Sequence, residues 1–160
     1  MKIKEYNRQK VKQYAEKWAY LRNPKYYDYE LIGGDCTNFA SQCIFEGLGI
    51  MNYNKLGWYY KNANDKSASW TGVEYLYKFL ISNKEIGPFA EKKSLEYAEI
   101  GDIIQLSFNG TTFAHSLVVV NKDEKDIYIS THTFDANNKP ISRYIYKDIR
   151  LIHILGVRTW

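Results

Sequence analysis

The sequence predicts an α+β fold with helices in its first half and antiparallel strands in its second half. Apolar residues recur at helical spacing up to about residue 82, whereas short β-branched segments follow residue 101. Asn109-Gly110, a strong hairpin signal, separates two of these segments. Helices followed by strands favour the α+β class. The 160 residues suit a single domain with a core, so we expect one domain over residues 1–160.

Three helices are expected in the first half. Apolar residues at i, i+3, i+4, i+7 and i+8 predict a helix over residues 8–21, which ends before Pro24. A second helix is predicted over residues 36–46, with Asp35 as its N-cap and Gly47 just past its end. These signals place a cysteine, Cys36, at the first position of a helix.

The third helix is predicted from a capping box. Thr71 and Glu74 have the spacing of that motif, and Trp70 with Tyr75 would form the accompanying hydrophobic staple. The helix is expected to run to about residue 82. Residues 48–68, between the second and third helices, are expected to be irregular.

Four strands are expected after Gly101. The predicted strands are residues 103–108, 113–120, 127–133 and 151–157. Residues 121–126 read as a polar turn and residues 135–140 as a loop.

Composition and charge describe a globular protein without a membrane span. Hydrophobic residues make up 45% and charged residues 25% of the chain, and no run approaches the roughly 20 apolar residues of a transmembrane helix. The net charge is +4, and residues 1–30 hold its basic excess. This excess suits either a solvated helix face or contact with a polyanion. No aromatic-and-basic pattern argues for nucleic acid.

The two cysteines, Cys36 and Cys43, are not expected to form a disulfide. On one helix they lie seven positions apart, which is about 10.5 Å along the axis and beyond disulfide reach. Cys43 falls on the apolar face and is expected in the core.

Cys36 follows Gly33-Gly34-Asp35, so a tight turn would place its thiol at the positive end of a helix. That position favours the thiolate, which is the nucleophilic form. A structural cysteine is the alternative interpretation.

Two histidines are candidates for the base and its orienting partner. If the turn takes up residues 121–126, Val120 pairs with Ile127 and His115 lies opposite His132. His115 would accept the thiol proton, and His132 would fix its tautomer. Asp135 is the rival orienting residue. His153, between two isoleucines, is expected to be packed and structural.

The remaining site residues complete an acyl-transfer mechanism that needs no metal or other cofactor. The Cys36 N–H would donate to the oxyanion, together with Tyr29 or Tyr27. Trp58, Tyr59 and Trp70 would either line a substrate cleft or belong to the core.

These motifs resemble the "putative amidase domain" family of Gram-positive bacteria. The resemblance covers nearly the whole chain and is most specific in one block, Gly34-Asp35-Cys36-Thr37-Asn38-Phe39. That family is similar to the cell-wall cysteine peptidases of the NlpC/P60 and CHAP type, in which the order is cysteine, histidine, third polar residue. The order matches Cys36, His115 and His132.

The resemblance implies a papain-like fold and an amidase or peptidase that acts on peptidoglycan. It also implies Asp35 and Asn38 as supporting residues beside the cysteine. The first residues are too polar for a signal peptide, so an extracytoplasmic wall enzyme would be a domain of a longer exported chain. We expect a monomer.

Three other functions remain open. A zinc amidase would use Cys36, His115 and His132 as ligands. A wall-binding module would keep the fold without catalysis. Acyl transfer to an amine would use the same cysteine and histidines.

Overall fold

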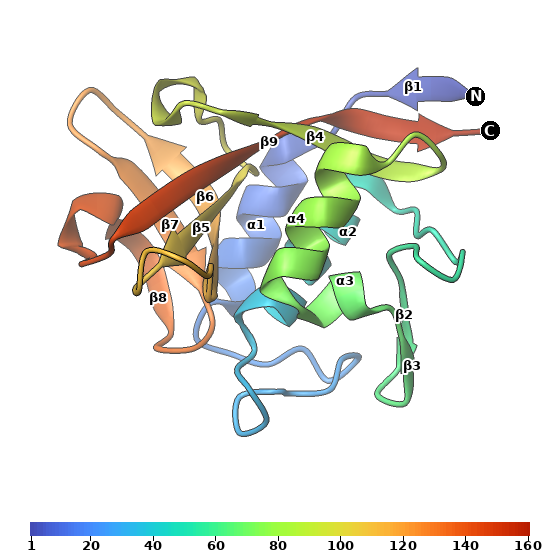
Figure 1. Ribbon diagram of the computed structural model, residues 1–160, viewed down its shortest axis with the longest axis horizontal. Helices are drawn as coiled ribbons and strands as arrows, with labels where there is room; N and C mark the ends of the chain where they lie inside the picture. The colour runs from blue at the N-terminus through green and yellow to red at the C-terminus, as the bar shows by residue number, and fades with distance from the viewer.

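The computed structural model describes residues 1–160 and shows a group of helices packed on a large, twisted antiparallel sheet (Figure 1). The predicted α+β class is confirmed. The α-helices are α1 (Arg8–Trp18), α2 (Cys36–Leu48), α3 (Ala68–Thr71) and α4 (Val73–Ser82), and two short 3-10 turns are η1 (Leu95–Tyr97) and η2 (Ile141–Arg143). No helix is long and apolar enough to cross a bilayer.

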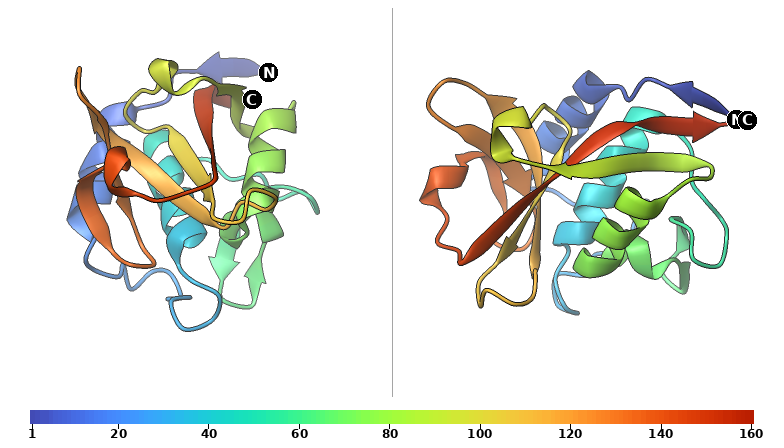
Figure 2. Two further views of the ribbon diagram at one scale, coloured as in Figure 1. Left: turned by 60° about the vertical axis from the view of Figure 1, so that its left-hand side comes forward. Right: turned by 45° about the horizontal axis from the view of Figure 1, so that its top comes forward.

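Seven strands form the main sheet, in the order β1-β9-β5-β6-β7-β8, with β4 also paired to β9. Their bounds are β1 (Lys2–Lys4), β4 (Gly87–Lys93), β5 (Ile103–Ser107), β6 (His115–Lys122), β7 (Ile127–Thr131), β8 (Ala136–Pro140) and β9 (Asp148–Thr159). A separate hairpin joins β2 (Tyr60–Asn62) to β3 (Asp65–Lys66). The long strand β9 organises the sheet because it pairs with β1, β4 and β5 (Figure 2).

The sheet has an apolar cluster on each face. The larger cluster joins the helices to side chains such as Ile103, Val118 and Val120. The smaller one lies on the opposite face and includes Leu106, Leu117 and other residues of β5 to β7. Helix α2 is the central helix, because most of its side chains are buried. Cys43 belongs to the larger cluster, and both cysteines are free thiols, as the sequence predicts.

A buried carboxylate ties the chain termini to the sheet. Asp102, which has no exposed surface, accepts from the Arg8 guanidinium at 2.8 Å and from His153 Nδ1 at 2.7 Å. The backbone N–H groups of Glu99 and Ile154 also donate to it. The predicted structural role of His153 is confirmed.

The start of α4 differs from the predicted capping box. Gly72 precedes the helix, and Thr71 ends α3. Trp70 is fully buried while Tyr75 is 62% exposed, so these side chains form no staple. Instead Glu74 pairs with Arg150 of β9, an interaction between segments that local spacing cannot reveal.

The strand predictions found β5, β6, β7 and β9 but missed others. Residues 135–140 were expected to form a loop, but residues 136–140 form strand β8. No strand was predicted at β4 or at the short strand β1. The predicted helix over residues 8–21 ends earlier, at Trp18, and residues 48–68 contain the β2–β3 hairpin. Polar residues fill β8, so hydrophobic alternation could not identify it.

The predicted register of the β6–β7 hairpin is wrong. Val118 pairs with Ser130, and the register shifts between Val119 and Asn121. Strand β6 continues to Lys122, so the turn is shorter than expected and Lys122, not Val120, pairs with Ile127. The β-bulge at Val120 takes back only one of the two residues of this shift. Because β7 ends at Thr131, His132 lies beyond the strand and does not face His115 across the sheet.

We expect Asp102→Asn to lower the free energy of unfolding by about 3 kcal/mol, since it removes the charge that Arg8 and His153 share in the interior. Urea denaturation measures the loss. Glu99→Gln is the matched control: its carboxylate is 3.5 Å from the same Arg8 but is 57% exposed, so the expected cost is below about 1 kcal/mol. Equal losses for both variants would contradict a special role for Asp102.

Candidate active site around Cys36

Two glycines create the sharp turn that starts α2. Gly33 and Gly34 have φ angles of +89° and +97°, which favour glycine. A Cβ at Gly34 would lie 2.8 Å from Thr133 Oγ1, so a side chain there would push the neighbouring loop away. The Asp35 N–H donates to the same Oγ1 at 2.9 Å. The Gly-Gly-Asp-Cys sequence therefore allows two loops to meet directly before Cys36.

The Cys36 thiol is held among hydrogen-bond donors at the beginning of β6. The backbone amides of Ser116 and Thr37 lie beside the sulfur, and the Thr37 hydroxyl lies 3.8 Å from it. Burial raises the pKa of the thiol above its ordinary value, and these donors lower it by a smaller amount. Cys36 is 6% exposed, so the resting sulfur is a protonated thiol at neutral pH.

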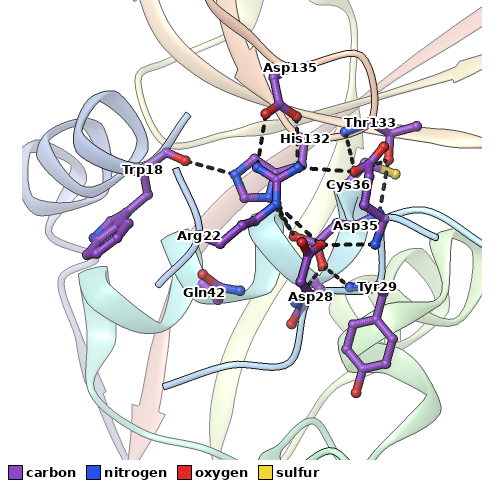
Figure 3. A network of polar contacts seen from close by, with 12 residues as sticks. Trp18, Arg22, Asp28, Tyr29, Asp35, Cys36, Gln42, His132, Thr133 and Asp135 are labelled. Carbon is purple, nitrogen blue, oxygen red and sulfur yellow. Dashed lines mark hydrogen bonds and ion pairs between the residues drawn. The ribbon is translucent and has the colours of Figure 1, made fainter. Parts of the chain in front are cut away.

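A buried ion pair lies directly behind the turn. His132 Nδ1 is 2.5 Å from Asp35 Oδ2, and His132 Nε2 is 2.8 Å from the carbonyl oxygen of Trp18 (Figure 3). Both ring nitrogens therefore have an oxygen partner within the protein, the Asp35 carboxylate for Nδ1 and the Trp18 carbonyl for Nε2. The ring also stacks on Phe39, with centroids 4.0 Å apart.

The other oxygen of Asp35 completes this anchor. Oδ1 accepts from the Tyr29 backbone N–H at 2.9 Å and from Asn38 Nδ2 at 2.8 Å. Asn38 Oδ1 in turn accepts from Trp70 Nε1. Asp35 thus connects four segments of the chain at the residue before the thiol, although it makes no side-chain cap to the α2 backbone.

Arg22 lies on the solvent side of the same region and binds carboxylates from two loops. Its guanidinium donates twice to Asp135, at 3.0 Å each, and once to Glu30 at 3.2 Å. Asp28 lies 3.3 Å from its Nε. Figure 3 shows Arg22 between Asp135 on one side and Asp28 on the other. This arginine fastens the loop after β7 to the loop that leads into α2.

The loop after β7 has an unusual backbone. Thr133 and Phe134 have φ angles of +62° and +59°, and such angles are costly for residues other than glycine. The Glu30 carboxylate accepts from the Thr133 N–H at 3.1 Å, which holds this conformation. Phe134 is consequently turned into solvent and is 92% exposed.

His115 opens strand β6, directly before the residue whose N–H contacts the thiol. It pairs with Leu106, and its ring lies 6.4 Å from the Phe108 ring and 6.3 Å from the Tyr144 ring. Its ring nitrogens make no hydrogen bond within the protein. Neither nitrogen is a fully buried polar atom without a partner. Burial, together with a smaller effect of the positive charge of Lys139, lowers the pKa of His115 to about 4. The imidazole is therefore neutral at pH 7.

The chain matches the model of the family described as "putative amidase domain" over residues 5–155. It belongs to this family. It is also 36% identical over 138 residues to the uncharacterized protein YhbB of Bacillus subtilis (strain 168). That match covers 82% of this chain and 43% of the relative, so the chain spans less than half the length of the curated relative that it matches. No solved structure matches.

Within this amidase-family domain, His132 does not have the position predicted for it. It was expected to hold the far nitrogen of His115, but Asp35 and the Trp18 carbonyl occupy both of its ring nitrogens. Asp135, the rival orienting residue, is bound by Arg22. The shorter β6–β7 turn accounts for the difference, because it shifts the register by two residues and the bulge at Val120 restores only one of them.

The expected aromatic cleft is also absent at two of its three residues. Trp58 and Trp70 have no exposed surface and belong to the larger core cluster, where their ring centroids are 4.6 Å apart. Their indole N–H groups donate to Ser41 and Asn38 of α2. Tyr59 is partly exposed, and its hydroxyl donates to Asp65. The tryptophans support α2 and do not face solvent.

Tyr29 and Asn38 support the turn rather than the oxyanion. The Tyr29 side chain points away from Cys36 (Figure 3), and its hydroxyl is buried without a partner. The Asn38 amide donates to Asp35 and to the Tyr27 carbonyl, so its donors are already in use. Of the predicted supporting residues, Asp35 and Asn38 contact each other directly beside Cys36.

Sequence reasoning missed Arg22, Thr133 and Ser116. Ser116 and Thr133 directly follow His115 and His132, and Arg22 lies two residues before Pro24, which ends the first predicted helix. That proximity to recognised motif residues is a signal that could have drawn attention to all three. Each of the three has a partner more than 70 residues away: Asp135 for Arg22, Asp35 for Thr133 and Thr37 for Ser116. No local pattern predicts these contacts.

The three proposed zinc ligands do not form a metal site. No group of three or more His, Cys, Asp and Glu side chains is arranged to hold a metal ion. His132 uses both nitrogens elsewhere, which leaves Cys36 and His115 without their third ligand.

We expect Asp35 and His132 to be energetically coupled. Asp35→Asn and His132→Leu should each cost about 3 kcal/mol of stability, because each leaves a buried partner uncompensated. The double variant should cost about 2 kcal/mol less than the two losses added together. Urea denaturation of all four proteins measures the coupling.

The matched control pairs Asp135→Asn with His132→Leu. Asp135 is bound on the surface by Arg22 and does not contact His132, so these two changes should be additive. Additivity of Asp35→Asn with His132→Leu would refute the buried pair.

Proposed function

We propose that this domain is a cysteine amidase in which Cys36 is the nucleophile and His115 accepts its proton. One observation carries the proposal: the sulfur lies at the start of a helix, beside the backbone amide of Ser116, which directly follows His115 in strand β6. A thiol needs such donors to become a stable thiolate when its proton leaves.

The position of the sulfur explains how a histidine on β6 serves a cysteine on α2. Ser116 Oγ contacts Thr37 Oγ1 at 3.0 Å, so Ser116 faces α2. Neighbouring side chains of a strand alternate, and His115 therefore leaves the opposite face. The N–H of a strand residue points along the sheet plane. The Cys36 sulfur, which lies beside the Ser116 N–H, is therefore near the plane of the sheet. A side chain from either face of the sheet can approach the sulfur there.

The protonation states define the chemistry. A neutral His115 removes the proton from the Cys36 thiol as the sulfur attacks the carbonyl carbon of the amide. The Cys36 N–H has no intrahelical acceptor and is available to the developing oxyanion. The imidazolium then protonates the leaving amine, and a thioester remains. Water, deprotonated by the again neutral His115, hydrolyses the thioester and restores the thiol.

This mechanism uses a pair rather than the expected triad. No polar side chain hydrogen-bonds His115 from behind, and the nearby Phe108 and Tyr144 rings restrict its movement instead. We assign His132 a positioning role, because it holds Asp35 and with it the turn that carries the thiol. The same pair would transfer the acyl group to an amine if water were excluded.

The proposed substrate is an amide bond of peptidoglycan. The resemblance to cell-wall cysteine peptidases with a papain-like fold supports this choice, and so does the family description as an amidase domain. The basic excess in residues 1–30 suits a polyanionic wall. We accordingly propose a monomeric domain of a longer exported protein that works at the cell wall.

Cys36→Ala is expected to abolish the release of peptides from purified sacculi, because no other group can form the thioester. Mass spectrometry of the released muropeptides measures the activity and identifies the bond. Circular dichroism should show an unchanged fold. Cys43→Ala removes the other thiol from the core and should retain turnover. Full release by Cys36→Ala would refute cysteine catalysis, whereas wall binding without release by the native protein would favour a binding module.

The acid limb of the activity profile should lie near pH 4. Protonation of His115 stops the reaction, and its pKa is lowered from its ordinary 6.5 to about 4. Activity should therefore persist as the pH falls from 7 to 5 and disappear below about 4. The pH dependence of kcat/KM measures this limb.

The same shift predicts a change in stability. The unfolded chain binds a proton at this histidine below pH 6.5, and the folded protein does so only near pH 4. Stability should fall as the pH decreases between these values, by about 3 kcal/mol. His115→Gln should flatten this part of the curve and reduce kcat at least about a hundredfold. An acid limb at 6.5 would contradict a buried neutral base.

A further inference from the structure

An open surface pocket beside His115 carries two cations without partners. The pocket has a volume of about 520 Å³ and is formed by the β7–β8 turn, β8, η2 and Tyr20. Lys139 and Arg143 line it, and neither side chain forms an ion pair or a hydrogen bond within the protein. The other charged group at the pocket, Asp135, is already neutralised by Arg22. The pocket is therefore positively charged overall.

Neighbouring residues connect the pocket to both proposed catalytic residues, although neither of these lines it. On one side Phe134 lines it, next to Thr133, whose hydroxyl contacts the residue before Cys36. On the other side the ammonium of Lys139 lies 4.1 Å from the centre of the Tyr144 ring, and that ring neighbours His115. Lys139 is close enough for its charge to lower the pKa of His115.

Sheet geometry places Lys139 on the same face as the His115 side chain. Lys139 pairs with Ile129, and Ile129 pairs with Val119 of β6. Val119 and His115 are an even number of residues apart and so share one face of β6. Tyr144 holds the lysine by a cation–π contact, which fixes the direction of the ammonium without neutralising it.

We propose that Lys139 and Arg143 form a subsite for a carboxylate of an acidic peptide, next to the amide bond that Cys36 attacks. This inference rests on the proposed function and adds the class of substrate. An anion is the ligand that two unpaired cations favour, and an extended peptide fits an open pocket along a strand. The carboxylate would also compensate the charge that Lys139 places beside His115.

The test uses two forms of one substrate. Purified sacculi are compared with sacculi whose free carboxyl groups have been converted to amides by carbodiimide and ammonium chloride. The native enzyme should release peptides about tenfold more slowly from amidated walls, since a charge-assisted contact contributes about 1.5 kcal/mol. Lys139→Met should lose about tenfold on native walls and little on amidated walls, so that the preference disappears.

Controls separate this inference from the catalytic proposal. Lys125→Met removes the same charge from the turn at the far end of β6 and should keep the tenfold preference. If Cys36→Ala is inactive but Lys139→Met still prefers native walls, the subsite is wrong and the nucleophile stands. If Cys36→Ala remains active, the proposed function fails.

A binding measurement tests the subsite without turnover. Nuclear magnetic resonance titration of the Cys36→Ala protein with N-acetylglutamate amide should shift the His115 ring and Lys139 signals, and N-acetylglutamine amide should not. Lys139→Met should remove the His115 shift. Equal responses to both compounds, or no response to either, would overturn the carboxylate subsite.

Discussion

The ion pair between Asp35 and His132 is the constraint on which the site depends. It joins the end of α1, the turn before α2 and the loop after β7 at the residue that precedes Cys36. Each oxygen and nitrogen of the pair has a partner, which is the condition for keeping such charges in the interior. Gly34 permits the close approach of the loops, and Arg22 fastens them from the solvent side. The position of the Cys36 thiol is thus set by Asp35, His132 and Arg22, whose side chains do not contact the sulfur.

Around this anchor the protein separates paired polar groups from the two groups that are proposed to react. Asp35, His132 and Arg22 are paired and fixed, whereas Cys36 and His115 are both neutral at rest. Burial produces this neutrality in both cases, by raising the pKa of the thiol and lowering that of the imidazole. Proton transfer between the proposed pair then creates charge only when a substrate has entered. The backbone amides of Ser116 and Thr37 are already positioned to stabilise the negative charge that forms on the sulfur.

The sequence was most informative where the signals are local. The glycine turn, the helix start at Cys36, the β5–β6 hairpin and the core position of Cys43 all follow from neighbouring residues. Predictions failed where distant segments decide the outcome. The shorter β6–β7 turn shifted the register so that His115 and His132 do not pair, and the packing of Trp58 and Trp70 under α2 removed both side chains from the surface. Strand β8 escaped detection because its polar residues show no alternation. Arg22 binds residues up to 113 positions away, a relation that one sequence cannot display.

The enclosure of Cys36 has a chemical consequence beyond acyl transfer. Peroxides and disulfides react with thiolates, and their attack requires access to the sulfur. A sulfur that is protonated at rest and almost covered reacts slowly with both. Cys43, the only other thiol, is completely enclosed and cannot serve as a resolving partner. Packing therefore slows oxidation of the Cys36 thiol for as long as the site is closed.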